Sequence, residues 1–227
     1  MKPRPHRGAI FHALAAALVL AAGTAARPAA AQDGPAVVGR SAQVYQRLTS
    51  LTADFDQVIE DRMLGEMKSK GKLVQAGTSR LAMRFSDPDG DAIVADGRYL
   101  WVYTPSTTPG QVLRLNLPST PVYGVNVLSW LLDKPAERYR STLLRTERID
   151  GRLADVVELI PTVPDLPFTR ALVWLDRGDA LPRRLEINER TGLKRTISLH
   201  RIRTNQNVSP GTFKFTVPKD VRVVDHG

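Results

Sequence analysis

Cysteine is absent from this 227-residue chain, and histidine is scarce, with four residues. Without a thiol, the chain can form no disulfide, no zinc–thiolate site and no cysteine nucleophile. Of the histidines, His6 and His12 lie in an N-terminal segment that we expect to be removed, and His226 lies on the terminal tail. His200 is then the single histidine of the predicted folded body, which excludes sites that need several imidazoles.

Catalytic motifs are missing as well. The chain has no G-x-S-x-G nucleophile turn, no Walker or dinucleotide glycine loop, and no spacing of His, Asp and Glu that suggests a metal site. Asp54 and Asp56 lie two residues apart on a predicted strand and so face the same side, and such a pair can serve a glycosidase. Acidic residues on a polar strand face are more commonly just solvated. We therefore expect no enzyme activity, no cofactor and no bound metal.

No hydrophobic run is long enough to suit a membrane-spanning helix. The N-terminal run, residues 9–22, follows a positively charged start and precedes an A-x-A motif at residues 29–31. This order is typical of a secretory signal peptide cleaved before Gln32, and a retained anchor helix is the alternative. Residues 1–31 are thus predicted to be a cleaved signal peptide, which would place the mature protein in the periplasm.

The charge balance argues against a nucleic-acid partner. The formal net charge is +9, from 32 basic and 23 acidic residues. Residues 1–31 hold four basic residues and no acidic one, so the mature chain carries 28 basic residues and a net charge of +5. These basic residues are interleaved with acidic ones, which is typical of a solvated surface. The mature chain, residues 32–227, suits one domain with a sizeable core.

Hydrophobic periodicity predicts one helix followed by many strands. Apolar residues between Ala36 and Ser50 recur at helical spacing, and from Leu51 onward the period becomes two. The predicted strands cover residues 51–59, 68–75, 80–85, 93–94, 99–103, 111–117, 141–149, 153–160, 171–176, 183–189, 193–203 and 213–217. About a dozen antiparallel strands with short helical insertions indicate a mainly β fold, either one strongly curved sheet or an open, incomplete barrel.

Two stretches suggest that the sheet is covered on both sides. In the hairpin at residues 92–105, Asp96-Gly97 supplies the turn, and the strand from Tyr99 to Tyr103 is apolar on both faces. The segment Pro118–Pro135 is too apolar for a solvated loop and favours a short helix that either fills a core or covers one. A curved sheet with surplus apolar surface is an architecture that binds apolar ligands.

Five fragments follow one another along the chain in a specific order. They are Asp54-Phe55-Asp56-Gln57, Gly71-Lys72-Leu73, Pro88-Asp89, Ile93 to Tyr103, and Phe213 to Pro218 followed by Val221. This succession resembles the LolA family of periplasmic lipoprotein carriers and covers nearly the whole mature chain. The resemblance implies an open barrel with a helical lid over an apolar cavity.

The resemblance also implies a function and a set of site residues. Such a carrier accepts the acyl chains of lipoproteins released from the inner membrane by an ABC transporter complex and delivers them to an outer-membrane receptor. We expect it to act as a monomer. By position, the cavity and lid are assigned to Tyr45, Leu48, Phe55, Leu81, Met83, Ile93, Leu100, Val127, Leu128, Trp130 and Leu131. Ordinary core packing is the alternative for each of them.

One departure from the family concerns how the lid is held. The family usually has Arg-Pro just before the third strand, and that arginine helps to keep the lid closed. Here the positions are Gly77-Thr78, which leaves Arg80, three residues further on, as the lid-locking candidate. Two other functions stay open: a lipid-sensing domain of an RseB-like envelope-stress regulator, and a secreted hydrolase, which the missing nucleophile disfavours.

Overall fold

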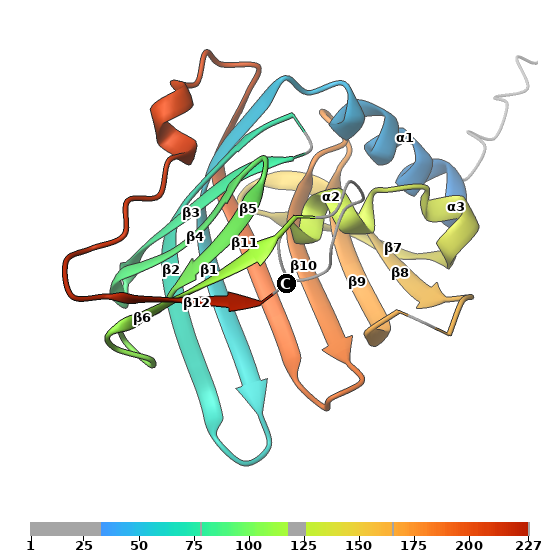
Figure 1. The fold of residues 1–227 in the computed structure, drawn as a ribbon. Helices are drawn as coiled ribbons and strands as arrows, with labels where there is room; N and C mark the ends of the chain where they lie inside the picture. The colour runs from blue at the N-terminus through green and yellow to red at the C-terminus, as the bar shows by residue number, and fades with distance from the viewer. Residues whose placement is uncertain (1–32, 78, 118–125, 165, 227) are drawn as a thin grey trace, which may run out of the picture. The chain divides into compact units, whose positions relative to one another are not determined.

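The structure, a computed structural model, describes residues 33–77, 79–117, 126–164 and 166–226 (Figure 1). The predicted signal peptide, residues 1–31, lies outside the described residues, as do Thr78 and residues 118–125 of the apolar segment. Within the described residues, no helix is both long enough and apolar enough to cross a membrane.

The helix α1 (Gly34–Gln46) begins and ends earlier than the predicted range of 36–50. Asp33 sets its start, because the carboxylate accepts a hydrogen bond of 2.8 Å from a backbone amide of the first turn. A Cβ atom at Gly34 would lie 2.5 Å from the carbonyl oxygen of Ser141. Glycine at this position therefore lets the start of the helix lie directly against the neighbouring strand.

The described residues contain twelve strands in one sheet (Figure 1). They are β1 (Ser50–Asp61), β2 (Gly65–Ala76), β3 (Arg80–Asp87), β4 (Asp89–Asp96), β5 (Tyr99–Tyr103), β6 (Gln111–Asn116), β7 (Tyr139–Ile149), β8 (Arg152–Pro161), β9 (Phe168–Asp176), β10 (Pro182–Glu189), β11 (Lys194–Thr204) and β12 (Arg222–His226). Their order across the sheet is β12-β6-β5-β4-β3-β2-β1-β11-β10-β9-β8-β7. The two end strands, β12 and β7, do not pair with each other, so the sheet is open. This confirms the predicted fold class.

The central hairpin, β4 and β5, is present, but its turn is shifted by one residue. Ala95 pairs with Leu100, so the two residues at the turn are Gly97 and Arg98 rather than Asp96 and Gly97. Gly97 supplies the positive φ, at +101°. Asp96 instead orders the turn through its carboxylate, which accepts hydrogen bonds of 2.8 and 2.7 Å from the two backbone amides that follow the glycine.

The predicted last strand, residues 213–217, is wrong. A short 3₁₀ helix, η1 (Pro210–Phe213), and an extended stretch occupy this region, and the last strand is β12, which runs parallel to β6. Phe213 is buried against the outer face of the sheet, and the ring of Phe215 stacks 5.4 Å from that of Trp101. The alternation in this segment therefore comes from packing across the face of the sheet, not from strand pairing.

The main apolar core lies on the other face, which we call the inner face. It packs beneath α1 and beneath a short helix, α2 (Val127–Leu131). A second short helix, α3 (Pro135–Arg138), contacts α1 and β7. The helix predicted within Pro118–Pro135 is thus present as α2. Leu100 belongs to this inner core, whereas its neighbour Trp101 packs with the outer cluster of Phe213. The expectation that β5 is covered on both sides is confirmed.

Candidate ligand-binding cavity

A cavity of about 60 Å³ lies between the inner face of the sheet and α2. Its walls are formed by Gln57, Leu73, Leu81, Met83, Phe85, Ile93, Asn126, Val127, Leu128, Leu185, Arg195, Ile197 and Leu199. Apolar side chains dominate this lining, and three polar side chains interrupt it. A mostly apolar space with a few placed polar groups is typical of a site for a small apolar or amphiphilic ligand.

The structure gathers some, not all, of the predicted site residues around this space. Leu81, Met83, Ile93, Val127 and Leu128 line the cavity. The remaining six belong to the same inner core without lining the cavity: Tyr45, Phe55, Leu100, Trp130 and Leu131 are buried in it, and Leu48 packs against it.

Sequence reasoning missed half of the apolar lining. Leu73 and Phe85 come from β2 and β3, and Leu185, Ile197 and Leu199 come from β10 and β11. The period-two pattern of β10 and β11 already marks these last three as one face of their strands. What the pattern does not contain is the pairing of β11 with β1, which brings this face against the first half of the sheet.

Arg80, the lid-locking candidate, is not part of the cavity. Its guanidinium lies over the ring of Phe213, 5.3 Å from the ring centroid, within the cover of the outer face. Leu81, the next residue along β3, points inward. Because neighbouring residues of a strand face opposite sides, Arg80 points away from α2. Its position gives no support to a role in locking the lid.

The start of α2 is instead held by three buried polar side chains, Tyr45, Gln75 and Asn126, which we call the clasp. The Tyr45 hydroxyl donates to the Gln75 Oε1 at 2.5 Å, and the Asn126 Nδ2 donates to the same oxygen at 3.0 Å. Asn126 also caps the helix, since its Oδ1 accepts from the backbone amide of Ser129 at 3.1 Å. Burial raises the pKa of Tyr45, so its hydroxyl stays protonated as a donor. The clasp thereby ties α2 to both α1 and β2.

The end of α2 is held by Arg138 on α3. The Arg138 Nη1 donates to the backbone carbonyl oxygen of Trp130 at 2.6 Å, and the guanidinium lies 4.4 Å from the centroid of the Trp130 ring. That ring in turn meets Phe168 edge-on at 5.6 Å. We call residues 126–132, which these contacts fix at both ends, the lid segment.

The size of the cavity determines what it can hold in this conformation. A volume of 60 Å³ has room for only about four to six water molecules, at roughly 10–15 Å³ each. A long acyl chain needs far more space. A ligand of that length can therefore enter only if the lid segment moves away from the sheet.

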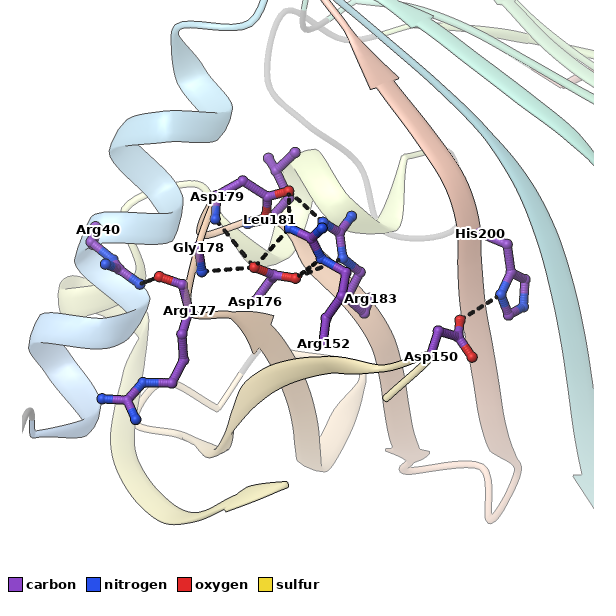
Figure 2. Close-up of polar contacts among 10 residues, drawn as sticks. All are labelled: Arg40, Asp150, Arg152, Asp176, Arg177, Gly178, Asp179, Leu181, Arg183 and His200. Atoms are coloured by element: carbon purple, nitrogen blue, oxygen red, sulfur yellow. Dashed lines mark hydrogen bonds and ion pairs between the residues drawn. The ribbon is translucent and has the colours of Figure 1, made fainter. Parts of the chain in front are cut away.

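Among the residues that the structure describes, the charged clusters offer no comparable site. Figure 2 shows one of them, in which the buried Asp176 receives Arg152, Arg183 and the backbone amides of Gly178 and Asp179. Burial alone would raise the pKa of Asp176, but these hydrogen bonds outweigh it and lower the pKa to about 2. The carboxylate therefore stays ionised and serves to fix the β9–β10 turn.

His200 lies on the outer face, between two carboxylates. Figure 2 shows its contact with Asp150. The distance from the His200 Nδ1 to the Asp150 Oδ2 is 2.9 Å, and that from its Nε2 to the Asp56 Oδ2 is 3.0 Å. With both ring nitrogens engaged, the imidazole is not presented to a nucleophile. A larger, open-sided hollow of about 630 Å³ adjoins it, but charged side chains such as Lys70 and Arg84 line that hollow, and it does not enclose an apolar chain.

These features define a protein with a curved open sheet and an apolar interior covered by a short helix. A family model described as "Outer membrane lipoprotein carrier protein LolA" matches residues 46–216. A relative from Alkalilimnicola ehrlichii named outer-membrane lipoprotein carrier protein is 27% identical over 190 residues, 82% of each chain. One of the same name from Pseudomonas putida is 24% identical over 219 residues, 95% of this chain and 98% of that one. The chain belongs to the LolA family, as its sequence fragments suggested.

A solved structure shares the fold. The crystal structure of an uncharacterised conserved protein from Thermus thermophilus aligns with a TM-score of 0.53 at 13% identity, over 84% of this chain and 97% of that one. At this identity the likeness concerns the fold alone.

Proposed function

We propose that this protein is a periplasmic carrier that shields the acyl chains of lipoproteins between the inner face of its sheet and the lid segment. In this proposal residues 1–31 are a cleaved signal peptide, and residues 32–227 form a single carrier domain that acts as a binding protein and not as an enzyme. The observation that supports it most is the apolar cavity beneath α2, in a chain whose relatives are named as lipoprotein carriers.

The energetics of an acyl chain explain why such a carrier is needed. Each methylene group removed from water contributes about 0.8 kcal/mol, so one long chain represents roughly 10 kcal/mol or more of unfavourable contact with water. A lipoprotein cannot cross an aqueous space against that cost without a shield.

Delivery also requires release. In the proposal, the acyl chains come from an ABC transporter complex of the inner membrane and pass to an outer-membrane receptor. A cavity that bound the acyl chains very tightly would not release them. A small closed cavity suits this task, because the inner core that refills the space when α2 returns competes with the ligand.

A charge placed in the cavity should prevent uptake. Leu81 and Leu128 are nearly inaccessible and line the space, so Leu81→Glu or Leu128→Glu would put an unpaired carboxylate into an apolar site. We expect each change to weaken the binding of a triacylated lipopeptide at least 100-fold. Leu144→Glu, the same exchange at a residue that is 41% exposed on β7, is the matched control and should bind as the unmodified protein does.

The ligand itself can be identified by native mass spectrometry of protein purified from the periplasm of expressing cells. A co-purified triacylated lipoprotein would support the carrier proposal and give its acyl stoichiometry. Normal affinity in a folded Leu128→Glu protein would mean that the cavity is misplaced. An apo mass that does not change when lipopeptide is added would favour the lipid-sensing regulatory domain instead.

A further inference from the structure

The inner face of four neighbouring strands, β10, β11, β1 and β2, is mostly apolar and carries one group of polar side chains. Towards the lid segment, the inward side chains of β10, β11, β1 and β2 are apolar, as Leu185, Ile197, Phe55 and Leu73 illustrate. The same face also carries Glu189, Arg195, Gln57 and Ser69, which we call the polar band. Apolar residues lie among them, since Ile59 and Ile187 pair with Arg195 and Ile197 pairs with Gln57.

The polar band is joined by hydrogen bonds from strand to strand. The Gln57 Nε2 donates to the Ser69 Oγ at 3.1 Å, and the Arg195 Nη1 donates to the Gln57 Oε1 at 3.3 Å. The Arg195 Nε donates to the Glu189 Oε1 at 3.2 Å. The four side chains therefore form one connected network, and two of them, Gln57 and Arg195, line the cavity.

The arginine has donors to spare for a ligand. A guanidinium carries five N–H groups in a planar fork. The contacts of Arg195 within the described residues use Nε and Nη1, and its Nη2 has no protein partner there. The cavity thus combines apolar walls with a hydrogen-bond donor at one end, which is the pattern that an amphiphile requires.

The net charge of the polar band determines whether a neutral or an anionic head group binds there more favourably. Glu189, whose side chain is 8% exposed, forms an ion pair with Arg195, so the band has no net charge. A second anion would meet the carboxylate of Glu189 at short range and with little water to screen it. A neutral carbonyl oxygen can accept an Arg195 N–H without that repulsion.

We propose that the polar band binds the neutral carbonyl oxygens of esterified acyl chains and so selects them over free fatty acids of the same length. This inference rests on the proposed function, since it concerns the polar end of the same cavity. In this arrangement Arg195 positions the ester, and Glu189 sets the selectivity by cancelling the charge of the arginine.

The test compares two ligands with one chain, palmitate and monopalmitoylglycerol, by displacement of a fluorescent acyl probe from the mature protein at pH 8, where the fatty acid is ionised. We expect the unmodified protein to prefer the ester about tenfold, equivalent to about 1.4 kcal/mol. Glu189→Gln leaves the arginine uncompensated and should reverse the preference. Arg195→Gln should weaken the binding of both ligands, and that of palmitate more.

Lys194→Gln serves as a matched control, because it tests whether the change in ligand preference comes only from the net charge of the protein. Lys194 precedes Arg195 on β11, points to the other face and pairs with Glu60 and Glu186. Lys194→Gln changes the charge of the protein as Arg195→Gln does and should leave the ester preference unchanged. If Glu189→Gln does not fold, as judged by its thermal melt, Gln57→Leu replaces it and should weaken ester binding several-fold with little effect on palmitate.

The outcomes separate a failure of the proposed ester selectivity from a failure of the proposed carrier function. If both ligands bind and their ratio is the same in the unmodified protein, Glu189→Gln and Arg195→Gln, the selectivity of the polar band is refuted and the carrier proposal stands. An unchanged ester affinity in Gln57→Leu would refute it as well. If neither ligand displaces the probe from any variant, the proposed function fails, and this inference fails with it.

Discussion

Breaking the clasp should open the lid segment without unfolding the sheet. Asn126 makes a hydrogen bond to Gln75 and caps α2 through the amide of Ser129. At about 1 kcal/mol for each of these bonds, Asn126→Ala should destabilise the closed lid by about 2 kcal/mol. That shifts the closed-to-open ratio by a factor of about 30. Tyr45→Phe removes the hydroxyl that donates to Gln75 at 2.5 Å and, at the longer distance of 3.4 Å, to Asn126. Gln75 stays paired with Asn126, so the effect should be about fivefold, as expected for the loss of about one hydrogen bond.

Hydrogen exchange measures this opening directly. The backbone amides of Trp130 and Leu132 donate to the carbonyl oxygens of Asn126 and Leu128, so they exchange when the lid segment opens. The protection factors of both amides should fall about 30-fold in Asn126→Ala and about fivefold in Tyr45→Phe. Amides in the middle of β1 should keep theirs, because the strand is paired on both sides.

The chain offers a matched control for the tyrosine. Tyr139 is buried in the same inner core, but its hydroxyl has no hydrogen-bond partner within the described residues. Tyr139→Phe should therefore leave the protection of the Trp130 amide unchanged. If Tyr45→Phe and Tyr139→Phe give the same protection there, the clasp does not hold the lid segment closed.

Two further predictions concern stability. The pKa of Asp176 is lowered from 3.8 to about 2, so its carboxylate contributes stability that is present above pH 3.8 and is lost as the pH falls toward 2. Asp176→Asn should flatten the dependence of the urea midpoint on pH over that range, and an unchanged slope would contradict this. Phe213→Ala empties the outer cluster and should lower the free energy of unfolding by about 3 kcal/mol while acyl uptake stays normal. Impaired uptake in a folded protein would mean that the outer cover is coupled to the cavity.

The strand pattern could be predicted from sequence because each strand buries one face. Leu81 and Met83, which the family resemblance places at the cavity, both line the space beneath α2, and alternation along β3 puts them on one face. The same signal failed at Phe213 and Phe215. An extended segment that packs across a sheet alternates as a paired strand does, and side-chain pattern contains no information about backbone hydrogen bonds.

The hydrogen bonds among the polar residues of the site could not be predicted from the hydrophobic pattern. Tyr45, Gln75 and Asn126 meet although 30 and 51 residues separate them in pairs. Neither periodicity nor motif spacing reports such contacts, because they depend on how the strands are ordered. Two local signs were available: Gln75 follows Leu73 on the inward face of β2, and Asn126 stands directly before an apolar helix, where asparagine is a favoured cap.

The clasp consists of a phenol and two amides, and none of these groups carries a charge near neutral pH. Salt screens the attraction between ions and leaves hydrogen bonds between buried neutral groups almost untouched. Burial keeps the Tyr45 hydroxyl protonated well into alkaline conditions. The energy that holds the start of the lid should therefore be nearly independent of salinity and acidity. A change in the ionic strength of the medium should therefore leave the protection of the lid amides unchanged.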